Sequence, residues 1–132
     1  MNDKPDLRQG RDRSLKRRVV MDRVFAEGRT AKGFPLLAKF TEMKPDGPAA
    51  SRVAFTVSKK RFRRAVDRNK IKRLMRETWR HRRSPFESGL PEGIQCAVVL
   101  IFVGKDIPSA QQMDKAMEKL LARMSEASIP QE

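Results

Sequence analysis

The chain has 132 residues, 39% of them hydrophobic, and its 30 Lys/Arg against 16 Asp/Glu give a formal net charge of +14. This length predicts one domain with a modest core, and so unbalanced a charge favours a polyanionic partner such as a nucleic acid. A single cysteine, Cys96, excludes an internal disulfide and suits a reducing cytoplasm, and the lack of an apolar run of about 18 residues excludes a membrane-spanning helix.

Residues 1–13 are polar, lack periodicity and contain no apolar targeting segment. They predict a flexible basic tail in which Arg8, Arg11 and Arg13 become ordered on RNA. We expect a cytoplasmic protein with no membrane association.

A first helix is predicted from Ser14, a suitable N-cap, to Glu27, with Gly28 ending it. Its apolar sector includes Met21 and Phe25, four residues apart. Such a pair more commonly belongs to a core, but it also suits a wall on which single-stranded bases stack. Both interpretations stay open at this point.

Three strands are predicted next. Residues 29–32 form a short strand, and residues 34–41 form a second, for which Pro35 favours a sheet edge or an early bulge. Residues 44–50, KPDGPAA, are typical of a turn. Alternating side chains over 52–58 predict a half-buried third strand.

The run from Lys59 to Arg83 holds thirteen Lys/Arg against two acids and also has helical periodicity. It predicts a helix over 66–83, with Asp67 placed well for the positive end of the helix dipole. Apolar residues fall on one side of this helix, and a continuous basic face falls on another. That face consists of Arg68, Asn69, Lys72, Arg73, Arg76, Arg80 and Arg83.

The remaining chain predicts a loop over 84–93, a central buried strand over 94–103 and a last helix that begins at a Ser109–Gln112 capping box. We place the end of the single RNA-binding domain, 14–125, within this helix and expect 126–132 to fray. The predicted apolar row of the helix is Met113, Ala116, Met117, Leu120, Leu121 and Met124. Mixed strands and helices in one small domain predict an α+β sandwich of helices on one sheet.

No catalytic or metal-binding constellation is recognisable. His81, the only histidine, lies among arginines, and Asp67 and Glu77 stand ten residues apart, which suits local ion pairs. Cys96 begins the most apolar strand and suits a buried position. A charge run is often merely solvated, but such faces usually mix signs, and this one favours phosphates. Asn69 on the same face has an amide suited to a base edge or a phosphate.

The stretch TVSKK followed by AVDRNKIKRLMRETWR resembles the signature of the bacterial ribonuclease P protein subunit, in which R-N-x-x-K-R-x-x-R opens the basic helix. The resemblance extends to LKRRVVMDRVFAEG, to VVLIF and to the last helix, and covers roughly residues 14–125. It implies an αβββαβα order with a mixed sheet and a left-handed βαβ crossover, an exception to the usual hand.

The resemblance also implies roles for particular residues. A catalytic RNA subunit would carry out hydrolysis with Mg²⁺ held mainly by the RNA, and no protein partner would be required. A cleft beside the first helix would receive the 5′ leader of precursor tRNA at Met21, Phe25 and Leu36. Met21 replaces a second aromatic, and Leu36 or Leu37 stands where relatives often have a strand aromatic. The implied RNA-subunit contacts are Lys59, Lys60, Arg68, Asn69, Lys72, Arg73, Arg76 and Arg80.

We therefore expect a ribonucleoprotein endoribonuclease subunit, without catalytic residues of its own, that promotes 5′ maturation of tRNA. Two alternatives are a ribosomal or RNA-chaperone protein with no processing role and a stand-alone nuclease.

Overall fold

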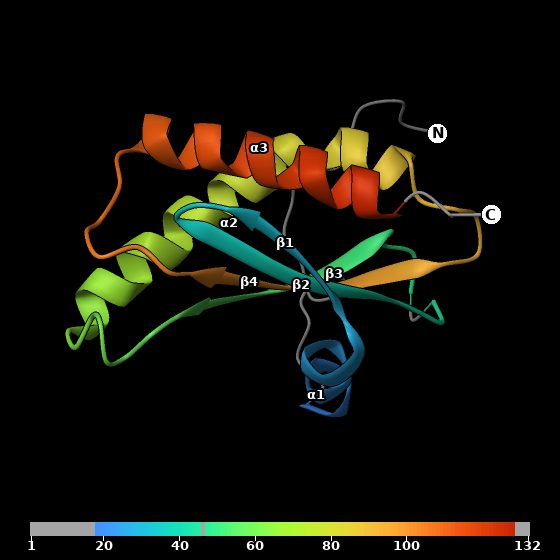
Figure 1. The fold of residues 1–132 in the computed structure, drawn as a ribbon, viewed down its shortest axis with the longest axis horizontal. Coiled ribbons are helices and arrows are strands. Elements are labelled where there is room, and N and C mark those ends of the chain that lie inside the picture. Colours follow the sequence, from blue (N-terminus) through green and yellow to red (C-terminus); the bar gives the residue numbers. More distant parts are fainter. Residues whose placement is uncertain (1–17, 46, 129–132) are drawn as a thin grey trace.

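The computed structural model describes residues 18–45 and 47–128, so the predicted tail and the Ser14 cap lie outside the described residues. Three helices and one four-stranded sheet make up the described chain (Figure 1). The predicted α+β class and the predicted order of elements are confirmed. In chain order the elements are α1 (Arg18–Glu27), β1 (Arg29–Gly33), β2 (Leu36–Met43), β3 (Ser51–Val57), α2 (Ala65–Ser88), β4 (Gln95–Phe102) and α3 (Ala110–Ser128).

The strands lie in the order β1-β2-β4-β3. β1 pairs with β2 and β2 with β4 in antiparallel fashion, whereas β3 and β4 are parallel and are connected through α2. The last strand in the sequence therefore lies between two earlier ones. The left-handed sense of the β3–α2–β4 crossover stays a prediction.

The main core lies between the sheet and the helices α2 and α3, which cover the same face (Figure 1). Alternate residues of each strand point to this face, as the two-residue period of a strand requires. The predicted apolar row of α3 is buried here in full. The largest fully buried side chains of this core include Trp79, Phe40, Phe102, Leu36, Ile71, Met75 and Leu100.

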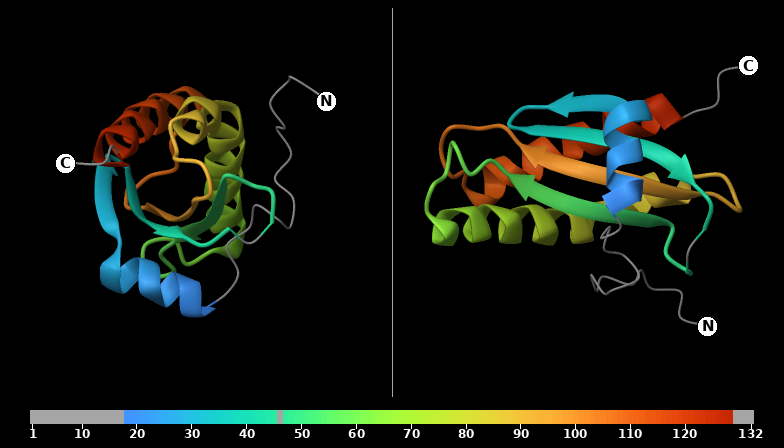
Figure 2. Two further views of the ribbon diagram at one scale, coloured as in Figure 1. Left: turned by 90° about the vertical axis from the view of Figure 1, so that its right-hand side faces the viewer. Right: turned by 90° about the horizontal axis from the view of Figure 1, so that it is seen from below.

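Helix α1 lies on the opposite face of the sheet (Figure 2). Its Val24 is fully buried against Ala97 and Val99 of β4. Both faces of β4 are thus covered, which explains why its sequence is continuously apolar where β3 alternates. After α1, Gly28 lets the chain turn closely, since a Cβ there would lie 2.2 Å from the Val24 carbonyl oxygen.

Two predicted boundaries are wrong. β2 is an interior strand, and Pro35 precedes it in the β1–β2 turn, so the edge inferred from this proline does not exist. α2 extends into the predicted 84–93 loop and ends at Ser88, with Pro85 inside the helix. The tilted contact of Trp79 with Phe86, whose ring centroids are 6.2 Å apart, packs this last turn on the core and overrides the local signal of the proline.

Helix α3 begins at the predicted capping box. The backbone N–H of Gln112 donates to Ser109 Oγ at 3.1 Å, and the backbone N–H of Ser109 donates to Gln112 Oε1 at 2.9 Å. The helix extends to Ser128, three residues beyond the predicted domain end, and Ala127 packs against the core. No helix among the described residues is long and apolar enough to cross a membrane.

Candidate nucleic-acid interface

The N-terminal half of α2 presents polar side chains on the side away from the core. Ile71 and Met75 are fully buried, which fixes the helix on the sheet. At about 100° per residue, the implied contact residues of this half other than Arg68 project from the far side. Among them Asn69, Arg73 and Arg76 are exposed, and Lys72 is partly exposed.

Arg76 lies where α2 meets β3, an edge strand of the sheet. Its guanidinium carbon is 5.6 Å from the ring centroid of Phe55, a cation–π geometry. This contact orients the guanidinium along the junction of helix and sheet, while the residue stays exposed. An arginine held in this way keeps its N–H fork for a phosphate.

Arg68 has a structural role that the sequence did not indicate. Its Nη1 donates to the carbonyl oxygens of Phe62 at 2.8 Å and Arg63 at 2.9 Å. The side chain thereby fastens the β3–α2 connection to the first turn of α2. Lys59 and Lys60 are exposed in that connection, at the approach to the helix.

Arg80 is only partly available to contact a phosphate, because its guanidinium donates a hydrogen bond to the Glu77 carboxylate at 2.7 Å. This hydrogen bond, with the positive charge of Arg80, holds the pKa of Glu77 below its ordinary value. Glu77 is therefore ionised, and it offsets Arg80 at the margin of the basic face.

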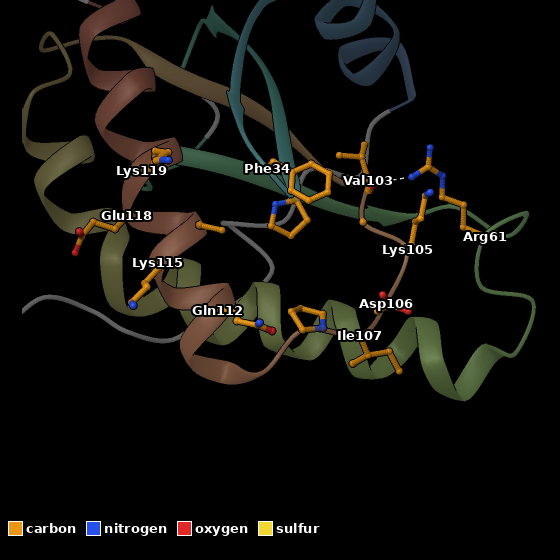
Figure 3. Close-up of a pocket in the computed structure, with 14 residues that line it drawn as sticks. Phe34, Arg61, Val103, Lys105, Asp106, Ile107, Gln112, Lys115, Glu118 and Lys119 are labelled. Carbon is orange, nitrogen blue, oxygen red and sulfur yellow. Dashed lines mark hydrogen bonds between the residues drawn. The ribbon is translucent and has the colours of Figure 1, made fainter.

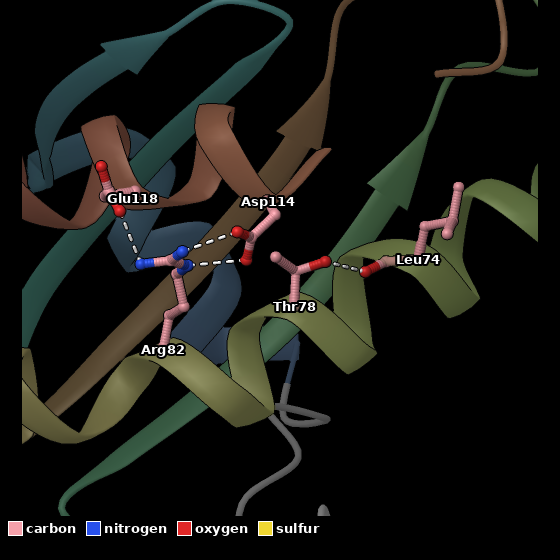
Figure 4. A network of polar contacts seen from close by, with 5 residues as sticks. All are labelled: Leu74, Thr78, Arg82, Asp114 and Glu118. Carbon is pink, nitrogen blue, oxygen red and sulfur yellow. Dashed lines mark hydrogen bonds and ion pairs between the residues drawn. The ribbon is translucent and has the colours of Figure 1, made fainter. Parts of the chain in front are cut away.

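Arg82 links α2 to α3 (Figure 4). Its Nε and Nη2 donate to the two carboxylate oxygens of Asp114, each at 2.6 Å, and its Nη1 donates to Glu118 at 2.7 Å. The fork lowers the pKa of Asp114 and raises that of Arg82. In the next turn back, the Thr78 hydroxyl donates to the Leu74 carbonyl, so it adds no exposed polar group.

Arg83 does not belong to the exposed basic face on which the sequence placed it. Its side chain is 3% exposed and lies 3.6 Å from the Glu87 carboxylate, which in turn accepts a 2.5 Å hydrogen bond from Ser51. Residue 83 follows Trp79 by one helical turn and therefore faces the sheet. The position of Arg83 on the helix, one turn after the buried Trp79, determines that its side chain is buried, although that side chain is charged.

The face of the sheet beneath α1 carries a strip of half-exposed residues from all four strands. In the strand register Leu37 pairs with both Lys32 and Ile101, and Ile101 pairs with Thr56. Leu37, Ile101 and Thr56 are partly buried and Lys32 is exposed. We call these four residues the sheet strip. It lies two residues along the strands from Val99, which α1 covers.

Two of the three predicted leader contacts lie on the α1 side. Phe25 is 44% exposed, and Met21 packs against the Val24 cluster while remaining partly exposed. Val24 is the core residue of α1, and Phe25, one position later, points about 100° away. The core interpretation of Phe25 is therefore wrong.

Leu36 cannot take the third role. It is 1% exposed and lies in the α2/α3 core, on the face of the sheet opposite α1. Neighbouring residues in a strand point to opposite faces, so Leu37 is the one that reaches the sheet strip.

Sequence reasoning missed the structural roles of Arg68, Arg82 and Arg83. For Arg82 a signal exists in Asp114 and Glu118, which are four apart and flank the apolar row of α3, but their partner is visible only once the helices are paired. The structure thus presents a basic α2 surface (Asn69, Lys72, Arg73 and Arg76) and a basic connection (Lys59 and Lys60). On the other side of the sheet it presents the exposed Phe25 of α1 and the sheet strip.

Comparison with known proteins finds one consistent group. The family model described as ribonuclease P matches residues 10–125. A ribonuclease P protein component from Porphyromonas gingivalis is 31% identical over 126 residues, which covers 95% of this chain and 92% of the relative. One from Chlorobaculum tepidum is 33% identical over 122 residues, covering 85% and 79%.

Solved structures show the same fold. The Staphylococcus aureus RNase P protein superposes with a TM-score of 0.67 at 22% identity, covering 83% of this chain and 93% of that one. The Thermotoga maritima RNase P protein gives a TM-score of 0.64 at 24% identity, with 83% and 96% coverage.

Proposed function

We propose that this chain, which belongs to the ribonuclease P protein family, binds a catalytic RNA subunit and the 5′ leader of precursor tRNA and so promotes cleavage at the tRNA 5′ end. The observation that carries the proposal is the basic α2 surface. Three cations and one amide project there from a helix whose other side is fully buried. The helix backbone is already fixed on the core, so little backbone order has to be gained on binding.

The chemistry of this surface fits RNA. Arg73 and Arg76 can each offer forked donors to phosphate oxygens, and the Asn69 amide can both donate and accept. Phosphate contacts of this kind fix position and orientation on a nucleic acid. The RNA subunit would bind here, with Lys59 and Lys60 extending the contact.

The leader of precursor tRNA is single-stranded, and it would lie on the α1 side of the sheet. Phe25 supplies an exposed aromatic plane, and the sheet strip supplies apolar and polar surface ending in Lys32. Unpaired bases stack on such planes, whereas paired bases cannot reach them. Separate surfaces for the RNA subunit and for the leader let one small protein contact both at once.

The hydrolysis is assigned to the RNA and its Mg²⁺ ions. Among the described residues no group of three Asp, Glu, His or Cys side chains is placed to hold a metal ion. The contribution of the protein is substrate affinity and neutralisation of phosphate charge.

The test compares purified protein, RNA subunit and their mixture on a precursor tRNA at low Mg²⁺ concentration. We expect no cleavage by the protein alone and strong stimulation of the RNA by the protein. Cleavage by protein alone would make it a nuclease, and RNA binding without stimulation would make it a structural binder.

Salt dependence gives a second test. With about six phosphates engaged, log K against log salt concentration should have a slope of roughly −4 to −5. A flat dependence would mean that the charge serves solubility and not recognition.

A further inference from the structure

The most exposed large hydrophobic residue of the described chain belongs neither to the basic α2 surface nor to the sheet strip. Phe34, at the turn between β1 and β2, is 77% exposed. Its ring borders an open depression formed by this turn, the segment after β4 and the first turns of α3 (Figure 3). An aromatic residue in such a position is not explained by the core, which is complete without it.

The depression has a basic lining. Lys105, Lys115 and Lys119 line it together with Arg61, which donates to the Val103 carbonyl. Two acids also line it, but Glu118 is engaged by Arg82 on its far side. Asp106 is the second lining carboxylate, so two acids stand against four cations.

The shape of the depression suits a segment of a polymer. Its volume is about 1170 Å³, above the roughly 300–1,000 Å³ of small-molecule sites, and it is open to solvent. Its floor is close-packed, because a Cβ at Gly104 would lie 2.7 Å from the Phe102 ring and 3.0 Å from Pro35 Cβ. The backbone there offers a fixed surface.

We propose that this depression is a third RNA-contacting site, which takes a single-stranded segment. One base stacks on Phe34, and the flanking phosphates lie against Lys105, Lys115 and Lys119. The exposed aromatic plane selects for unpaired bases, and the surrounding cations select for phosphate.

The position of the site supports RNA over a protein partner. Arg61 lines the depression and directly follows Lys59 and Lys60 in the basic connection. The basic α2 surface, the connection and the depression therefore form one cationic path around the end of the sheet. An RNA bound at α2 can continue past this connection into the depression, where four cations outnumber two acids.

The test is a titration of the ¹⁵N-labelled full chain with a single-stranded uridine octamer, followed residue by residue by NMR. The Gly104 amide reports on the depression, and the Asn69 amide reports on α2. We expect a saturable shift at Gly104 that an RNA duplex of equal length does not produce. This assay uses protein without the RNA subunit, so its result is independent of the proposed function.

Two substitutions test the two parts of the site. Phe34→Ala should raise the Kd at Gly104 by about 5- to 100-fold and leave the Kd at Asn69 within about twofold. Phe34→Leu keeps apolar bulk but no ring and should behave like Phe34→Ala. For charge, Lys105→Glu should weaken binding at Gly104, whereas Lys44→Glu, also in an exposed loop and equal in charge change, should not.

Other outcomes overturn the proposal. The absence of a shift at Gly104, or an equal loss with Lys44→Glu, would leave only non-specific charge attraction. Shifts at Gly104 on concentrating the protein without RNA would make the depression a contact between copies of this chain. Full binding by Phe34→Leu would remove stacking from the site.

Discussion

The two halves of α2 are both rich in arginine, yet they use it differently. In the first half Arg73 and Arg76 are exposed, and their charges are open to a partner. In the second half Arg82 is held by two carboxylates of α3, and Arg83 is buried beside Glu87. The first half lies along the sheet edge at Phe55, whereas Arg82 ties the second half to α3. Charge in a sequence therefore becomes binding capacity only where the fold leaves it without an internal partner.

The largest effect is expected from the buried cation of the second half. Arg83→Ala should lower the free energy of unfolding by about 3 to 5 kcal/mol, because it leaves Glu87 in a mostly buried site without this counter-charge. Urea unfolding measures the loss. Arg73→Ala, on the exposed face, is the matched control and should change stability by no more than about 0.5 kcal/mol.

An equal effect of Arg83→Ala and Arg73→Ala on the free energy of unfolding would contradict the difference between the two halves of α2. This difference would be sharpened by Arg83→Met combined with Glu87→Gln, which removes both charges and should recover part of the loss.

The next effect concerns the exposed half. Lys72→Ala with Arg73→Ala should weaken binding of the RNA subunit by about 2 to 4 kcal/mol, since two charged contacts are lost. Arg68 stays unchanged in this variant because it donates hydrogen bonds to the Phe62 and Arg63 carbonyl oxygens. Its substitution would change the stability of the fold as well as RNA binding. Filter binding measures affinity, and thermal unfolding shows that the fold is intact.

The control for this pair is Arg23→Ala with Lys44→Ala, which removes the same charge from exposed positions outside α2. If it weakens RNA binding equally, net charge and not the α2 surface determines affinity.

Helix α1 shows the same contrast between adjacent residues. Phe25→Ala should weaken binding of precursor tRNA by the holoenzyme by about 1 to 3 kcal/mol and leave mature tRNA, which has no leader, unaffected. Val24→Ala should instead destabilise the fold by about 2 kcal/mol, because Val24 is fully buried. Equal losses for both tRNAs with Phe25→Ala would remove Phe25 from the leader site.

The smallest effect tests the clamp between α2 and α3. Asp114→Asn should cost about 0.5 to 1 kcal/mol at neutral pH, the value of a partly exposed ion pair. Arg82 lowers the pKa of Asp114 below its ordinary 3.8, so the contribution is complete above that value and disappears as pH falls through the lower pKa of the folded state. Thermal unfolding of both proteins between pH 7 and pH 2 should show the difference closing only in acid.

Asp22→Asn, which removes an exposed acid of α1 away from the clamp, is the control. A difference between Asp114→Asn and the parent chain that persists at pH 2 would mean that the hydrogen bonds, and not the charge, stabilise the clamp.

Most elements were predictable because periodicity and caps are local properties. The apolar row of α3, its Ser109–Gln112 capping box and the buried β4 all follow from short stretches of sequence. The end of α2 was not predictable, since Pro85 is a local stop signal and only the packing of Phe86 on Trp79 overrides it. The interior place of β2 is likewise a property of the whole sheet.

The site was predictable in part for the same reason. The basic α2 surface follows from helical spacing, whereas the burial of Arg83 and the pairing of Arg82 depend on residues 4 to 36 positions away. Leu37 takes the place of Leu36 as the expected leader contact because a shift of one residue along a strand reverses the face to which the side chain points. Family resemblance left Leu36 and Leu37 as alternatives, and the burial of Leu36 in the α2/α3 core places only Leu37 on the α1 face of the sheet.

The central position of β4 has a consequence for synthesis of the chain on the ribosome. β2 and β3 are separated in the sheet by a strand that begins at residue 95. Until β4 has emerged, β3 has no neighbour in the sheet, and β2 is paired only with β1. A nascent chain therefore carries its basic helix before it has a completed sheet to pack against. Domains generally fold as units during synthesis, so this one cannot complete its sheet before residue 102, more than three quarters of the 132-residue chain, has been made.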